Sequence, residues 1–132
     1  MIATEIPHNE WRSYCRDFNV KHSGWPVSVE SLEYDGKHRI LTNDDKEFAF
    51  INIYPDRTRG EVAQIELGAY GKTRQTMIVP RLSAMKAERM ANGTDAGLEI
   101  YSKDYGIVII RFQKMFSLQL ELLNETMRRK AS

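Results

Sequence analysis

The sequence predicts an α+β fold: an N-terminal helix packed on a curled antiparallel sheet of six or seven short strands, with a small barrel as the limiting case, and a C-terminal helix. Apolar residues recur every three or four positions up to residue 22, alternate with polar ones as far as residue 112, and give way to helix formers from residue 113. A chain of 132 residues is long enough for one core. We therefore expect a single domain over 1–132, with its core at about 6–112 and a helical extension at about 113–130.

The first helix is expected from Pro7 to His22. Proline suits a first helical turn, where its missing N–H costs nothing, and Gly24 suits the position just after a helix. The apolar face of this helix carries Trp11, Tyr14, Cys15, Phe18 and His22. This face predicts that the helix covers the sheet, with Trp11 and Trp25 as anchors between them.

The first two strands are expected to form a hairpin. Residues 25–30 alternate between apolar and polar side chains, as a strand with one wet face requires. The dipeptide Asp35-Gly36 is a strong hairpin signal. Residues 37–41 should therefore return as the partner strand.

The rest of the sheet is predicted from apolar runs between turns. Residues 46–54 are almost wholly apolar, which indicates a central strand covered on both faces and ended by Pro55. Further strands are expected over residues 63–69, 73–79, 82–90, 98–102 and 106–112. Residues 82–90 include helix-forming side chains, but Met85 and Ala87 fit an alternating strand. We expect an extended strand there, at the edge of the sheet.

The C-terminal segment is expected to form a helix from about Met115 to Arg129, because it has no β-branched residue before Thr126. Its apolar residues would lie on two opposite sides of that helix, which then needs two surfaces to bury against. One surface is the sheet of its own chain, and we expect a second subunit to supply the other. The predicted dimer helix carries Phe116, Leu118, Leu120, Leu122, Leu123 and Met127.

Charge and cysteine content exclude several classes of protein. Against 18 Asp and Glu, 19 Lys and Arg leave a formal net charge of +1, so no overall field attracts nucleic acid or membranes. The single cysteine, Cys15, cannot form an internal disulfide and suits a small buried hydrophobe. No signal peptide and no apolar run of about 18 residues is present. We expect a soluble cytoplasmic protein with no membrane partner.

Several short motifs follow one another between about residues 6 and 112. They are Ile6-Pro-x-x-x-Trp11, His22-Ser-Gly-Trp25-x-Val-x-Val-Glu30, Ile-x-Leu-Gly68, Val79-Pro80, and Leu98-Glu-Ile-x-Ser-x-Asp104 leading to Arg111-Phe112. Their order and spacing resemble a family of small bacterial proteins known only as a domain of unknown function. The chain departs from that family in its more aromatic middle and in the helix after Phe112. The resemblance implies no reaction, substrate or catalytic residue.

Residues 46–53 are the most serious candidate for a binding site. They approach the RNA-recognition octamer, in which alternate aromatic residues stack on bases and a basic residue meets phosphate. The candidate nucleic-acid face carries Lys46, Phe48 and Phe50. Glu47 and Ile53 depart from the octamer, and only a hairpin precedes this strand where that fold has a strand and a long helix. A buried central strand is the competing interpretation.

Other motifs do not specify chemistry. Residues 68–73 look like the end of a phosphate-binding loop, but a strand follows them where that loop needs a helix, so we interpret them as a turn. His8, His22 and His38 lack the spacing of metal ligands, and no Ser or Cys nucleophile motif is present. We predict no catalytic residue, no cofactor and no metal.

The most economical expectation is a non-enzymatic binding or protein-interaction module that forms homodimers. The first alternative is single-stranded nucleic-acid binding on an aromatic face of the sheet. The second is a small hydrolase or ligand-binding barrel, which requires a concave pocket with converging polar groups.

Overall fold

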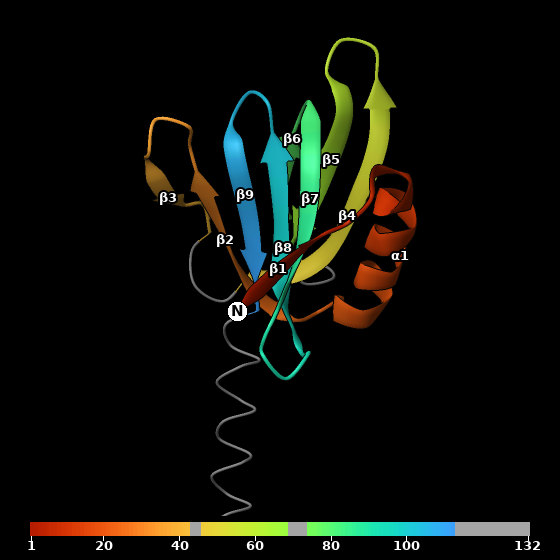
Figure 1. The fold of residues 1–132 in the computed structure, drawn as a ribbon, viewed down its shortest axis with the longest axis vertical. Helices are drawn as coiled ribbons and strands as arrows, with labels where there is room; N and C mark the ends of the chain where they lie inside the picture. Colours follow the sequence, from red (N-terminus) through yellow and green to blue (C-terminus); the bar gives the residue numbers. More distant parts are fainter. Residues whose placement is uncertain (43–45, 69–73, 113–132) are drawn as a thin grey trace, which may run out of the picture.

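The computed structural model describes residues 1–42, 46–68 and 74–112, which form one α-helix and nine antiparallel strands (Figure 1). A 3-10 turn, His8–Glu10, leads into the helix α1, Trp11–His22. The strands are β1 (Ile2–Glu5), β2 (Pro26–Leu32), β3 (His38–Ile40), β4 (Lys46–Asp56), β5 (Gly60–Leu67), β6 (Gln75–Val79), β7 (Leu82–Arg89), β8 (Asp95–Ser102) and β9 (Gly106–Arg111). The predicted α+β class and the helix packed on an antiparallel sheet are confirmed. Within these ranges, no helix has the length and apolar character that crossing a membrane requires.

The sheet is curled but open. Its strands run in the order β1-β7-β8-β9-β2-β4-β5-β6, and β3 pairs with β2 off this path. β2 joins two parts of the sheet, the larger part β1-β7-β8-β9 and the smaller part β4-β5-β6. It pairs with β9 over residues 28–32 but with β4 only at Pro26 and Val27. Beyond these two pairs, α1 takes the place beside β4 (Figure 1). The end strands β1 and β6 do not pair with each other, so a closed barrel is not formed.

The sheet also has more strands than the six or seven predicted. All four residues of β1 are exposed, so no alternation of buried and exposed side chains predicts this strand. β1 pairs with β7, which places β7 inside the sheet. The prediction of a strand over residues 82–90 is therefore confirmed, whereas its predicted edge position is wrong. The predicted C-terminal helix, with all its dimer residues, lies outside the described residues.

One side of β4 is covered by a side chain of α1 instead of a strand. The amide of Asn19 donates a hydrogen bond to the carbonyl oxygen of Ile51 at 2.9 Å and accepts one from the N–H of Ile51 at 2.8 Å. Backbone N–H groups alternate in direction along a strand, so Pro55 has its missing N–H on this same side. The strand therefore continues through Pro55 to Asp56, and the prediction that this proline ends it is wrong.

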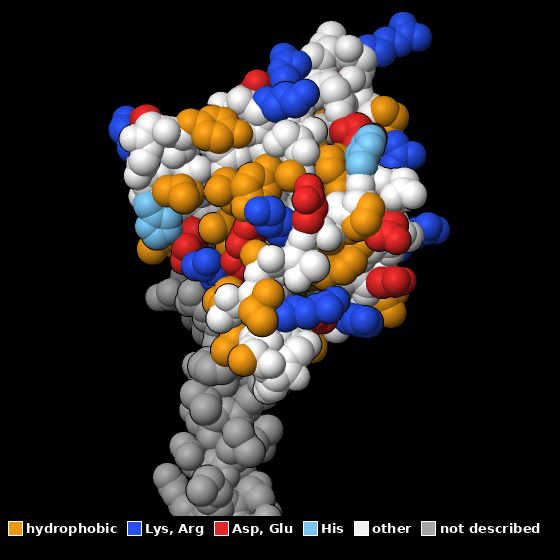
Figure 2. Space-filling view, viewed as in Figure 1, with side chains coloured by type: hydrophobic (Ala, Val, Ile, Leu, Met, Phe, Trp, Pro, Cys, Tyr) orange, Lys and Arg blue, Asp and Glu red, His pale blue; other side chains and the backbone are white. Residues whose placement is uncertain are grey.

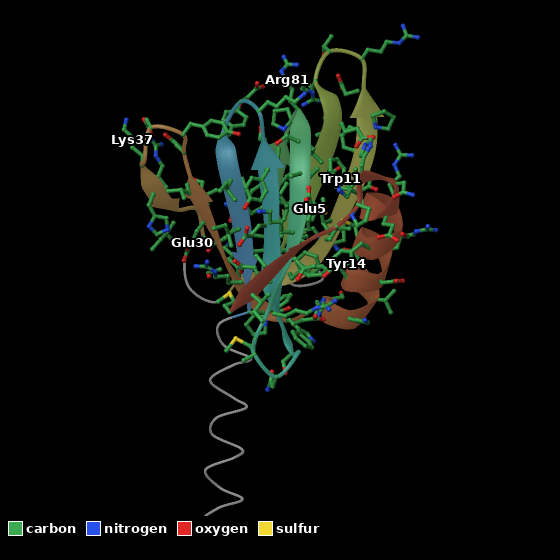
Figure 3. The ribbon with its side chains drawn as sticks, viewed as in Figure 1. Glu5, Trp11, Tyr14, Glu30, Lys37 and Arg81 are labelled. Carbon is green, nitrogen blue, oxygen red and sulfur yellow. The ribbon has the colours of Figure 1, made fainter. Side chains whose placement is uncertain are left out.

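The core lies between α1 and the two halves of the sheet. Trp11 is only 5% exposed and donates its Nε1–H to the carbonyl oxygen of Ile6 at 3.0 Å (Figure 3). Phe18 meets Phe48 edge to face, with ring centres 5.2 Å apart, and stacks on Phe112 at 5.5 Å. Trp11 therefore anchors the helix to the sheet, as its place on the apolar face predicts.

Candidate anion-binding groove

A groove runs along the junction between α1 and the free side of β4. Its volume is about 480 Å³. Residues from the helix and from the strand line it in equal number: Arg12, Cys15, Arg16, Asn19, Phe50, Ile51, Asn52 and Ile53. The groove exists because β4 leaves β2 after two residue pairs and α1 lies alongside it in place of a neighbouring strand (Figure 1).

The helix side of the groove is basic. Arg12 and Arg16 are four residues apart on α1, so they lie on the same exposed side of the helix. Neither forms an ion pair with any described residue. Arg74, just before β6, holds its guanidinium carbon 6.0 Å from the centre of the Phe50 ring. Three cationic side chains are thus gathered near one aromatic ring.

One carboxylate shares the outer face of the sheet with Phe50. Glu66 of β5 lies opposite Phe50 and is buried. Its Oε1 accepts hydrogen bonds from Nε2 of Gln64 at 2.9 Å and from the hydroxyl of Thr76 at 2.8 Å. Glu66 does not line the groove, and the charged side chains that do line it, Arg12 and Arg16, come from α1.

The three residues of the predicted nucleic-acid face do not share one face. Phe48 is 0% exposed and belongs to the core, whereas Phe50 is half-buried and lines the groove. A β-bulge between them shifts the register by one residue, so Phe48 falls on the core side with Ile51. The predicted alternation is therefore wrong here. Lys46 lies at the start of β4, opposite Val27, and does not line the groove.

The strand side of the groove supplies hydrogen-bonding groups. Asn52 is exposed, and its side-chain amide offers both donors and an acceptor. Ile53 is two residues beyond Ile51, so its backbone N–H and C=O point to the same free side, past the reach of Asn19. The groove therefore combines cations that can bind anionic groups, an aromatic ring on which a planar group can stack, and an amide that can hydrogen-bond the polar edge of that group.

Cys15 lies at the bottom of the groove but is not a nucleophile. Burial raises the pKa of its thiol to about 12, so almost no thiolate exists at neutral pH. Its Sγ lies 3.8 Å from the Sδ of Met85 in the core. Cys15 therefore packs as a small hydrophobic residue, as its place on the apolar helix face predicts.

His22 is buried at the end of α1 among aromatic rings. It stacks on Phe112 at 4.6 Å and meets the edge of Trp25 at 4.5 Å. Its Nδ1 lies 2.9 Å from the carbonyl oxygen of Phe18, and its Nε2 lies 3.2 Å from Oδ2 of Asp95. Both ring nitrogens face acceptor oxygens of the protein itself, so His22 has none to offer a substrate, and its role is structural.

His22 makes stability depend on pH. Burial lowers its pKa below the ordinary 6.5, with Asp95 opposing that shift. The unfolded chain therefore binds this proton first, and the free energy of unfolding is expected to fall as pH drops below about 6.5. Urea unfolding between acid and neutral pH measures this slope. His22→Gln should reduce the slope, and equal slopes in wild type and His22→Gln would contradict the assignment.

The outer face of the part of the sheet formed by β7, β8, β9 and β2 carries an ion-pair network beside exposed hydrophobic side chains (Figure 2). Arg111 lies 3.3 Å from a carboxylate oxygen of Glu30 and 3.3 Å from one of Glu88. Burial and a hydrogen bond with Glu99 raise the pKa of Glu88, and Arg111 opposes this. Within the part of the chain that the structure describes, no group of three His, Cys, Asp or Glu side chains is placed to hold a metal ion.

Sequence reasoning found one residue of the groove, Phe50, and missed its arginines. The spacing of Arg12 and Arg16 was the signal that could have found them. Two like charges four residues apart on a helix repel each other, and an anion bound between them relieves that repulsion. Comparisons with protein-family models, curated proteins and solved structures find no match to this chain. The resemblance to a family of unknown function therefore stays a prediction.

Proposed function

We propose that the protein is a non-enzymatic binding module that takes a short single-stranded nucleic acid in the groove between α1 and β4. The observation that carries this proposal is the pair Arg12 and Arg16, which have no carboxylate partner among the described residues and stand beside the half-buried ring of Phe50. Cations beside an aromatic ring are what binding to single strands requires.

Each side of the groove has a distinct role in this proposal. Arg12 and Arg16 contact successive phosphates, and one base stacks on the face of the Phe50 ring that Arg74 does not cover. The amide of Asn52 hydrogen-bonds the edge of that base. A single stacking ring and a net charge of +1 imply weak binding that depends on salt and shows little sequence preference.

The double variant Arg12→Gln/Arg16→Gln tests the phosphate contacts. In fluorescence anisotropy with short labelled single strands, the slope of log affinity against log salt should become shallower by about 1.4, because each contact contributes about 0.7. Phe50→Ala should instead weaken binding by about 1–3 kcal/mol and leave the slope unchanged. Two different signatures are therefore expected from the two sides of the groove.

The matched control removes two cations elsewhere. Lys37 lies at the tip of the β2–β3 hairpin, on the opposite edge of the molecule from α1 (Figure 3). Lys103 lies in the turn between β8 and β9. Lys37→Gln/Lys103→Gln should bind as wild type does. No binding at low salt overturns the proposal. So does an acidic peptide that binds as tightly and is insensitive to Phe50→Ala, since the groove would then be a general anion site.

We also propose that the chain forms homodimers, and this proposal rests on sequence alone. Its support is the two-sided apolar pattern from Met115 to Arg129. Light scattering after size exclusion should give twice the mass of the 15.3 kDa chain, and truncation after Lys114 should return a monomer. A monomeric full-length chain at micromolar concentration, unaffected by the truncation, would rule the dimer out.

A further inference from the structure

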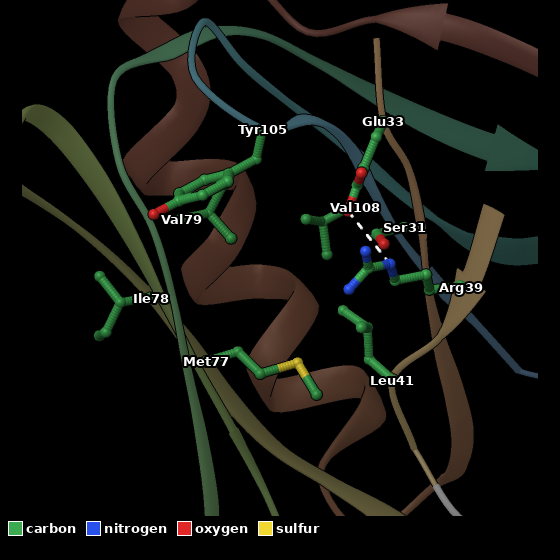
Figure 4. A pocket seen from close by; sticks show the side chains of 9 residues that line it. All are labelled: Ser31, Glu33, Arg39, Leu41, Met77, Ile78, Val79, Tyr105 and Val108. Atoms are coloured by element: carbon green, nitrogen blue, oxygen red, sulfur yellow. Dashed lines mark ion pairs between the residues drawn. The ribbon is translucent and has the colours of Figure 1, made fainter. Parts of the chain in front are cut away.

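A second cavity lies between β6 on one side and β2, β3 and β9, with the turns that adjoin them, on the other (Figure 4). Its volume is about 220 Å³. Most of its wall is apolar and comes from Leu41, Met77, Val79 and Val108, with Tyr105 at the rim. The cavity shares no lining residue with the groove beside α1, so a ligand bound here is independent of the proposed nucleic-acid function.

An arginine lines this space from its solvent-exposed side, with 59% of the Arg39 side chain exposed. Figure 4 shows the guanidinium of Arg39 pointing among Leu41, Met77 and Val108. Its Nε lies 3.3 Å from Oε1 of Glu33, and this is the one ion pair it makes among the described residues. The hydrogen-bond donors on its two terminal nitrogens have no described partner. A planar guanidinium held in this way presents a fork that matches a carboxylate.

We propose that this cavity binds a small monocarboxylate with a compact apolar body, such as an arylacetic acid. The carboxylate accepts hydrogen bonds from the terminal nitrogens of Arg39, and the hydroxyl of Ser31 lies on the same wall to donate another. The apolar body displaces water from Met77 and Val108. An engineered cavity of about 150 Å³ holds benzene, so this slightly larger one has room for one ring and a short side chain.

Glu33 selects the charge of the ligand. Its carboxylate lines the cavity and already balances part of the Arg39 charge, so a second negative charge on the ligand would meet repulsion. A neutral amide would offer the terminal donors of Arg39 one uncharged acceptor oxygen in place of the two charged oxygens of a carboxylate. The site therefore favours one negative charge over none or two. For the same reason, Glu33 competes with the ligand for the guanidinium.

The test is an NMR titration of the full chain with phenylacetate and with phenylacetamide, its neutral analogue. Phenylacetate should shift the resonances of Leu41, Met77 and Val108, and the amide should bind at least about tenfold more weakly. Arg39→Met keeps the apolar stem and should lose about tenfold in affinity, which is about 1.4 kcal/mol. Glu33→Gln removes the competing carboxylate and should bind phenylacetate several-fold more tightly. Lys37→Met, on the same hairpin but outside the cavity, should change neither affinity.

Four results would each overturn the proposal. The first is equal affinity for the acid and the amide, which would show that the charge is not recognised. The second is unchanged binding in Arg39→Met. The third is weaker or unchanged binding in Glu33→Gln, a variant that answers the question even if the loss of Arg39 disturbs the fold. Shifts spread over the whole spectrum, with none concentrated at the cavity, would count as nonspecific binding and would also reject the site.

Discussion

Gly97→Ala is expected to lower the free energy of unfolding by about 4 kcal/mol or more. A Cβ atom at this position would lie 2.0 Å from the carbonyl oxygen of Ile110 on the neighbouring strand and 3.1 Å from Oε1 of Glu88. The clash with Ile110 involves buried backbone inside the pairing of β8 with β9, so it cannot be relieved by turning a side chain. Urea unfolding followed by circular dichroism measures the loss.

Gly93→Ala is the matched control for this prediction. A Cβ there meets no atom within 4 Å, but φ is +86°, a conformation that side chains disfavour. The cost should be about 1–2 kcal/mol, from the backbone alone. Similar losses in the two variants would show that the close approach of β8 and β9 is not what requires a glycine at position 97.

Phe48→Ala is expected to cost about 3–5 kcal/mol, because it removes a fully buried ring from the centre of the aromatic core. Phe50→Ala, two residues along the same strand, should cost less than about 1 kcal/mol, because its ring is half-exposed in the groove. Thermal or urea unfolding of both variants gives the comparison. The first change should act on stability and the second on binding.

Equal destabilisation by the two substitutions would contradict the bulge between them. It would mean that both rings contribute to the core, and that Phe50 is not available to stack on a ligand. Unchanged stability in Phe48→Ala would also contradict the structure, because it would mean that Phe48 is not buried. Phe48 and Phe50 would then share one exposed face, as the sequence pattern suggests. The pair therefore tests the local geometry of β4 independently of any ligand.

The helix and most of the strands could be predicted because each rests on a local pattern. The apolar residues Trp11, Cys15 and Phe18 recur at helical spacing and are all buried against the sheet. The hairpin at Asp35-Gly36 follows from turn chemistry that involves only neighbouring residues. Elements set by short-range periodicity are thus within reach of sequence reasoning.

Three features of the fold were out of reach, each because a distant part of the chain determines it. β1 is a strand only because β7 offers it an edge, and its own residues are all exposed. The bulge before Phe50 depends on the register of β4 against β5, and no pattern of residues within β4 predicts it. Whether β1 and β6 meet depends on the curl of the whole sheet.

The candidate groove shows the same division. The sequence indicated Phe50 as a candidate for ligand contact, since it lies in an aromatic strand; it could not show that Arg12 and Arg16 would stand beside it. That juxtaposition depends on the hydrogen bonds that fix Asn19 to Ile51 and so set the position of α1 along β4. One amide side chain places the cations next to the ring.

The same amide has a consequence for how the protein behaves in a crowded solution. A strand with an uncovered side is a template on which a strand of another chain can pair and start an aggregate. On β4, Asn19 occupies both backbone groups of Ile51, and Pro55 offers no N–H. Among the described residues, the backbone N–H and C=O of Ile53 stay free between these two positions, so a strand of another chain could form only a short, interrupted ladder here, while the groove stays accessible to a ligand.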